Sequence, residues 1–127
     1  MIRTATILAA LALATPALAD PSGLIVCTSP GIIDGDTMAC GDQRIRLWGI
    51  DAPERYTPAG PASTRALAEI TTGQTLACKA RGTSYQRTVA QCWIGKTDVA
   101  AEMVRRGHAI DYPKYSGGYY ALGGNGR

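Results

Sequence analysis

The fold of this chain is decided by residues 44–54, which read RIRLWGIDAPE. Apolar Ile45 and Leu47 alternate here with two arginines, and such alternation predicts a β-strand with one apolar and one charged face. Pro53 ends the strand, because proline has no backbone N–H to donate to a neighbouring strand. The segment therefore predicts a half-buried strand that leads into an exposed acidic turn.

Similar patterns recur on both sides of this segment. Strands are expected over 24–28, 44–50, 75–81 and 87–94, with turn signals at Asp34-Gly35 and around Gly82-Thr83-Ser84. One helix is expected from Gly60-Pro61 to Gly73, and a second from Asp98 to Gly107. With one further strand beside the Asp34-Gly35 turn, before 44–50, the resulting order is strand, strand, strand, helix, strand, strand, helix. It predicts a mainly β fold with helices (α+β), an OB-type five-stranded barrel with two helices.

Length and composition exclude several classes of protein. The 127 residues amount to one domain at most. With 18% charged and 46% apolar residues, the chain is neither a disordered polyelectrolyte nor a membrane bundle. A net charge of +3 is compatible with a phosphate-bearing partner but excludes a polybasic coat for a membrane or chromatin.

The first nineteen residues have the pattern of a signal peptide. Arg3 precedes an apolar run at 7–14 that is too short to span a bilayer, and 17–19 read ALA, which fits the small-x-small cleavage rule. The alternatives are an uncleaved anchor or a buried helix. We expect 1–19 to be removed, leaving one domain over 20–127 in an exported monomer, periplasmic or extracellular, with no stable membrane association.

Export favours a disulfide interpretation of the four cysteines. No C-x-x-C pair is present and the chain has one histidine, so a zinc site is not expected. Three pairings are possible. We favour Cys27–Cys40 and Cys78–Cys92, because each pair brackets a turn-rich segment between two strand-like runs.

Three acidic residues, Asp36, Asp51 and Glu54, lie at turns or strand ends. Two carboxylates from separate strand ends plus a backbone carbonyl form a hard oxygen set, which suits calcium rather than zinc or copper. Arg46 and Arg87 lie on strands, where a rigid guanidinium can hold a phosphate through two hydrogen bonds. Each residue alone is typical of an ordinary turn or strand edge. Together they form a cation site, a carboxylate base and two guanidinium groups. These are the groups required to hydrolyse a phosphodiester with water.

The motifs 33–37 (IDGDT), 44–54, 85–87 (YQR) and 103–107 (MVRRG) resemble those of the staphylococcal nuclease-like (thermonuclease) domain family. The resemblance covers about 24–115, and its central stretch is highly specific. It implies the OB-type barrel and assigns site residues. Calcium ligands would be Asp36, Asp51 and the backbone carbonyl of Ala52; Glu54 would be the general base, Arg46 and Arg87 the phosphate-binding catalytic arginines, and Tyr85 and Tyr115 substrate contacts near the nucleotide.

Two departures from the family pattern stand out. Gln86 replaces the glycine of a Tyr-Gly-Arg motif, which costs about 1 kcal/mol if that position needs a positive φ. Residues 116–127 form a glycine-rich tail where the family continues into a C-terminal helix, so that helix is expected to be missing.

The sequence thus predicts an exported, calcium-dependent nuclease. It would hydrolyse phosphodiester bonds of DNA and RNA with little base specificity and, by the resemblance, leave 3′-phosphate ends. The alternative is a catalytically impaired barrel module that binds nucleic acid or protein.

Overall fold

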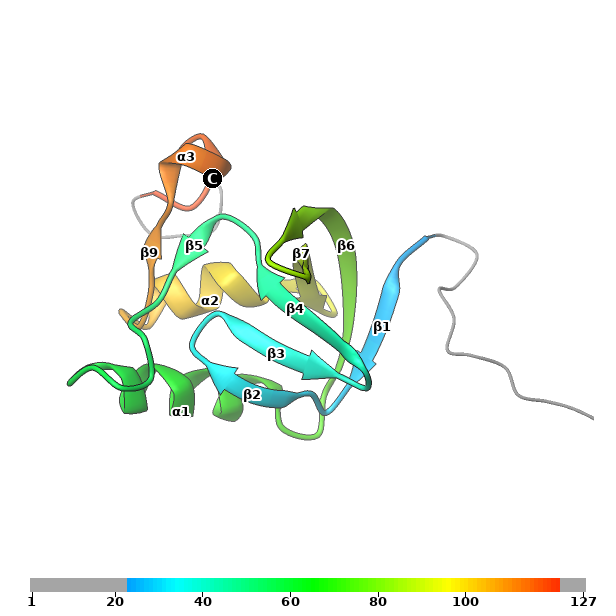
Figure 1. The fold of residues 1–127 in the computed structure, drawn as a ribbon, viewed down its shortest axis with the longest axis horizontal. Helices are drawn as coiled ribbons and strands as arrows, with labels where there is room; N and C mark the ends of the chain where they lie inside the picture. The colour runs from blue at the N-terminus through cyan, green and yellow to red at the C-terminus, as the bar shows by residue number, and fades with distance from the viewer. Residues whose placement is uncertain (1–22, 122–127) are drawn as a thin grey trace, which may run out of the picture.

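The computed structural model describes residues 23–121. The predicted signal peptide over 1–19 lies outside the described residues, as does the end of the glycine-rich tail. The described part contains these strands and helices: β1 Ile25–Thr28, β2 Gly31–Asp34, β3 Thr37–Cys40, β4 Gln43–Leu47, β5 Ile50–Asp51, α1 Gly60–Thr71, β6 Thr75–Ser84, β7 Arg87–Ile94, β8 Thr97–Asp98, α2 Val99–Arg105, β9 Ile110–Asp111 and α3 Pro113–Ser116 (Figure 1). The mainly β fold with helices is therefore as predicted.

The main sheet runs in the order β1-β6-β7-β4-β3-β2, with β8 added beside β7. Its two end strands, β1 and β2, are consecutive in the chain and are joined only by Ser29 and Pro30. Because two residues span roughly 7 Å, the sheet must curve until its ends approach each other. β1 and β2 together thus act as one interrupted strand, which gives five main strands in the OB arrangement.

Both predicted disulfides are present, and each joins neighbouring parts of the barrel. Cys27 on β1 bonds to Cys40 on β3, which links the two strands on either side of β2 in the chain. Cys78 and Cys92 are register partners on β6 and β7, with their Cα atoms 4.0 Å apart. In the chain-entropy model, closing loops of this length contributes roughly 3 kcal/mol each.

The alternation seen in the sequence of β4 determines which side chains fill the barrel. Ile45 and Leu47 are fully buried, whereas the arginines between and beside them face outward. α1 packs against β2 and α2 against β7 (Figure 1). None of the helices within residues 23–121 has the length and apolar character needed to cross a membrane.

Both predicted helices are confirmed, with starts close to those expected. α1 begins at Gly60, where a Cβ would lie 2.0 Å from the Glu54 carbonyl oxygen, so only glycine fits. α2 begins after Asp98, whose carboxylate accepts a hydrogen bond from the Ala101 N–H across 3.1 Å. A third helix, α3, spans four residues (Pro113–Ser116) and was not predicted, and the stretch after it forms turns up to Ala121.

Two local predictions were wrong. β6 continues to Ser84, and the turn lies at Tyr85-Gln86, where both residues have positive φ (50° and 65°). Gly82 instead lies at a register shift in the β6–β7 pairing, so its φ of 143° serves a bulge. The strand expected over 44–50 is also broken, because Gly49 adopts a φ of 82° and turns the chain into β5.

Candidate active site

Asp36 lies in the turn between β2 and β3 and is 6% exposed. Its Oδ2 accepts a hydrogen bond from the Ala52 N–H across 2.9 Å, and its Oδ1 accepts one from the Thr37 hydroxyl across 3.2 Å. The turn is held close to α1, because a Cβ on Gly35 would lie 1.9 Å from Ser63 Oγ. Burial fixes the direction of the carboxylate as well as its position.

Arg46 connects Asp36 to Asp51. Its Nη1 lies 3.4 Å from Asp36 Oδ2, and its Nη2 lies 3.8 Å from Asp51 Oδ1. The Nη1 group also donates to the carbonyl oxygens of Leu47 and Ile50, each across 2.8 Å. The Arg46 side chain is only 15% exposed, so the guanidinium is fixed rather than solvated.

The three residues assigned as metal ligands are brought together at this point. Asp51 lies on β5 with its side chain 53% exposed, and Ala52 follows it directly. Burial raises the pKa of Asp36 to about 6, although the neighbouring Arg46 and the Ala52 N–H act to lower it. The buried position therefore disfavours the charged form of the Asp36 carboxyl, and Arg46 and the Ala52 N–H offset part of that effect. Within residues 23–121 no cluster of three or more His, Cys, Asp or Glu side chains is present.

Glu54 lies in the exposed turn between β5 and α1. Its backbone carbonyl accepts hydrogen bonds from the Thr57 N–H across 2.9 Å and from the Thr57 hydroxyl across 2.7 Å. Its carboxylate forms no hydrogen bond or ion pair with the rest of the described chain. The Glu54 side chain is therefore exposed and has no partner among residues 23–121.

Arg87 and Arg46 lie on the same face of the sheet. β4 and β7 pair in parallel with Arg46 opposite Val89, and Arg87 is two residues before Val89 on the same side. Arg87 nevertheless folds back onto its own hairpin, where its Nε donates to the Ser84 carbonyl across 3.1 Å. Unlike Arg46, it makes no contact with the two aspartates.

The two tyrosines assigned to the nucleotide are accessible but lie in different settings. Tyr85 is 90% exposed at the β6–β7 turn, with the Arg87 guanidinium 5.9 Å from its ring centre. Tyr115 on α3 is also exposed and packs edge-on against Tyr112, with ring centres 5.0 Å apart. Neither ring contacts Asp36 or Asp51.

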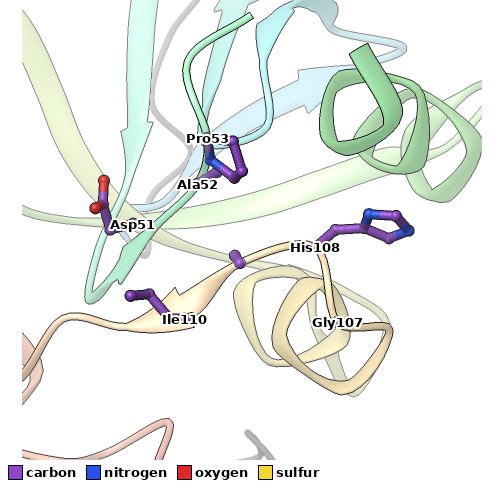
Figure 2. Close-up of a pocket in the computed structure, with 7 residues that line it drawn as sticks. Asp51, Ala52, Pro53, Gly107, His108 and Ile110 are labelled. Carbon is purple, nitrogen blue, oxygen red and sulfur yellow. The ribbon is translucent and has the colours of Figure 1, made fainter. Parts of the chain in front are cut away.

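A pocket of about 270 Å³ adjoins the site on another side of β5 (Figure 2). It is lined by Asp51, Ala52, Pro53, Gly107, His108, Ala109 and Ile110. The Asp51 carboxylate and the His108 ring point away from each other in Figure 2. The pocket therefore adjoins the site at Asp51 and Ala52, but it does not bring the His108 ring to the two aspartates.

Sequence reasoning missed Thr37, Ser63 and the C-terminal contacts of the Trp48-Gly49 turn. Thr37 could have been suggested by its position directly after Asp36, where a hydroxyl can reach the carboxylate. The contact of Ser63 with the Asp36 turn has no local sequence signal, because α1 reaches the turn only through the tertiary fold.

Comparisons with known proteins identify a family and several relatives. A family model described as "Staphylococcal nuclease homologue" matches residues 44–121. A Haemophilus influenzae protein named "Uncharacterized endonuclease" is 34% identical over 96 residues, which is 71% of this chain and 54% of that protein. "Protein ParB" of Escherichia coli is 34% identical over 126 residues, 88% of this chain and 69% of that protein. "Probable endonuclease LCL3" of Scheffersomyces stipitis is 40% identical over 84 residues, 58% of this chain and 36% of that protein.

This chain thus spans about half the length of the Haemophilus relative and about a third of the Scheffersomyces one. The matched region includes β4, β5 and β7, and with them Arg46, Asp51 and Arg87. The family model matches more than half of the chain, which establishes the relationship, although Asp36 lies outside the matched residues. The chain belongs to the staphylococcal nuclease homologue family.

Proposed function

We propose that this chain is an exported, calcium-dependent nuclease that hydrolyses phosphodiester bonds in DNA and RNA with little base specificity. The observation that carries the proposal is the Arg46 guanidinium, fixed between the Asp36 and Asp51 carboxylates. Two relatives whose printed names include "endonuclease" support the reaction class, and members of the family are generally metal-dependent. The two disulfides are compatible with an oxidising compartment outside the cytoplasm.

Each side chain of the site has a distinct role in this reaction. Glu54 takes a proton from water, whose oxygen then forms a bond to phosphorus. The bond from phosphorus to the 5′ oxygen breaks, and that oxygen takes up a proton from solvent, which leaves a 3′-phosphate and a 5′-hydroxyl. Arg46 and Arg87 hydrogen-bond the phosphoryl oxygens as their negative charge grows.

Asp36, Asp51 and the carbonyl of Ala52 would hold calcium, which would neutralise part of the charge on the phosphate. The Nη1 group of Arg46 is already committed to two backbone carbonyls and Asp36. Its Nε forms no hydrogen bond within residues 23–121, which leaves Nε available for the phosphate, whereas Nη2 lies 3.8 Å from Asp51 Oδ1. Tyr85 and Tyr115 are exposed rings on which nucleotides can stack.

One observation favours the alternative, a barrel module that binds nucleic acid without turnover. Arg87 is hydrogen-bonded to Ser84 rather than directed to the two aspartates. The free Glu54 and the paired aspartates favour the nuclease, because a binding module has no need of the acids.

A zymogram with DNA or RNA in the gel, run on the mature protein with calcium or with chelator, separates the two. Clearing in calcium that disappears both in chelator and in Glu54→Gln supports the nuclease. Retardation of nucleic acid with no clearing under either condition supports the binding module instead.

A further inference from the structure

The turn between β4 and β5 holds the Arg46 side chain in place. This turn, Trp48-Gly49, is flanked by the Leu47 and Ile50 carbonyls, to both of which Arg46 Nη1 donates across 2.8 Å. A change in the path of the turn would therefore move two acceptors of the guanidinium at once. We call Leu47–Ile50 the arginine corner.

The outer side of the arginine corner is covered by Tyr120. A Cβ on Gly49 would lie 2.7 Å from Tyr120 Cε2, so the ring lies directly against the backbone of the corner. Tyr120 is fully buried, and the Trp48 ring packs edge-on against it with ring centres 5.7 Å apart. A second contact also fixes the corner: the Tyr112 N–H donates a hydrogen bond to the Gly49 carbonyl across 2.8 Å.

Tyr120 is itself held at both ends. Its hydroxyl donates to Asp98 Oδ2 across 2.8 Å, and its backbone N–H donates to Asp111 Oδ1 across 3.1 Å. Asp111 also accepts a hydrogen bond from the Ser116 hydroxyl, which fixes the segment that carries Tyr120. Asp98 is the N-cap of α2 and accepts a hydrogen bond from Gln91, so the ring is anchored to the barrel as well.

We propose that Tyr120 is a positioning residue for Arg46, acting through the arginine corner. The Tyr120 ring fixes the backbone path at Gly49. The Leu47 and Ile50 carbonyls then fix the position of the Arg46 guanidinium, which in turn fixes the spacing of Asp36 and Asp51. The consequence for catalysis rests on the function proposed above, whereas the effect on the corner does not. Tyr120 is outside the segment from which the site was assigned, in the stretch that the sequence marked as a glycine-rich tail.

The test compares Tyr120→Leu, which removes the ring but keeps an apolar side chain, with Tyr120→Phe, which keeps the ring. Leu76→Ala is the matched control, because Leu76 is fully buried on β6, and truncating it costs stability without touching the corner. Amide exchange by NMR is measured at Trp48, Ala52 and Tyr112, whose N–H groups bond to Ala90, Asp36 and Gly49. Calcium affinity is measured by calorimetry, and kcat and KM on single-stranded DNA.

We expect Tyr120→Leu to speed exchange at these three amides more than at the rest of the sheet. It should weaken calcium binding about 10-fold and lower kcat more than it raises KM, because supporting contacts of this kind typically contribute 10–100-fold. Tyr120→Phe keeps the ring against Gly49 but loses the hydrogen bond to Asp98, so it should lie between wild type and Tyr120→Leu in all three readouts. Leu76→Ala should lower the unfolding temperature without changing calcium affinity.

The proposal is overturned if Tyr120→Leu is folded and keeps wild-type exchange at these amides, or if Leu76→Ala affects them equally. If Tyr120→Leu does not fold, Asp111→Ala serves as the second variant, because it removes the hydrogen bonds from Ser116 and from the Tyr120 N–H. Wild-type exchange at the three amides in Asp111→Ala would also overturn the proposal. If the wild-type protein neither binds calcium nor cleaves DNA, the function proposed above fails. The exchange data alone then decide whether Tyr120 holds the corner.

Discussion

The Ala52 N–H donates a hydrogen bond to Asp36 Oδ2 across 2.9 Å, which joins the turn after β2 to the segment after β5. These two segments are far apart in the sequence, yet they share one buried carboxylate. Asp36 is buried, whereas Asp51 is largely exposed. Removing the two side chains should therefore change the stability of the protein by different amounts.

Asp36→Ala and Asp51→Ala should both raise the calcium concentration needed for half-maximal activity, since each removes a negative ligand. Only Asp36→Ala should also lower stability, by about 1–3 kcal/mol, because it leaves the Ala52 N–H and Arg46 without their partner. Calcium titrations of activity and urea unfolding check the two effects separately. Equal loss of stability in both variants would contradict this distinction.

Glu54→Gln should lower kcat by a factor on the order of 10²–10⁴ with little change in KM. Glutamine keeps the size and polarity of the side chain but cannot accept the proton from water. Steady-state kinetics on single-stranded DNA in saturating calcium provide the measurement. Glu69→Gln, a change of another exposed glutamate on α1, is the control and should leave kcat unchanged.

Arg46→Lys should lower kcat on the order of 10²-fold, because lysine cannot reproduce the planar set of donors that contacts two carbonyls and two carboxylates. Arg87→Lys should have a smaller effect, since this guanidinium is hydrogen-bonded to Ser84. Parallel kinetics on the two variants decide the order. A larger loss from Arg87→Lys would mean that Arg87 leaves Ser84 when substrate binds.

Gln86→Gly should stabilise the protein by about 1 kcal/mol, because Gln86 has a φ of 65° that glycine adopts without strain. Gln86→Ala is the control and should bring no gain, since alanine keeps the Cβ that causes the strain. Thermal unfolding of the three proteins is the measurement. The same stability in all three would show that the turn relaxes around its side chain.

Glu102 should contribute to stability only above acidic pH. Its hydrogen bond with Arg105, followed by that with Arg106, lowers the pKa of Glu102 from 4.5 to about 2. A lowered folded-state pKa gives stability that is present above pH 4.5 and is lost as the pH falls towards 2. The difference in unfolding free energy between wild type and Glu102→Gln should therefore shrink over this range. It should also decrease in high salt, because Arg105 is exposed.

The sequence predicted the parts of the fold that depend on local patterns. The alternation around Ile45 and Leu47 gave β4 and its buried face, and Asp98 marked the start of α2. The cysteine pairing followed from strand positions on either side of turn-rich segments. The roles of the site residues came from the resemblance to a family rather than from local patterns, and they stay predictions.

The parts that could not be predicted depend on contacts between distant segments. The sequence placed a turn at Gly82, but Gly82 lies in a bulge where the register between β6 and β7 shifts. The turn itself lies at Tyr85-Gln86. Tyr120 lies among glycines and carries no periodic signal, yet it is buried because the chain turns back over Gly49. The folded-back position of Arg87 likewise has no signal in a strand pattern.

The place of Tyr120 in the chain has a consequence for the timing of folding. Tyr120 is the largest of the fully buried side chains in the described part of the protein. A chain that emerges from its N-terminus during synthesis can pair β1 to β7 before residue 120 is available. Until then the core has a vacancy over Gly49, and the two carbonyls that hold Arg46 lack their support. We therefore expect the barrel strands to be able to pair before Arg46 is fully held between its aspartates.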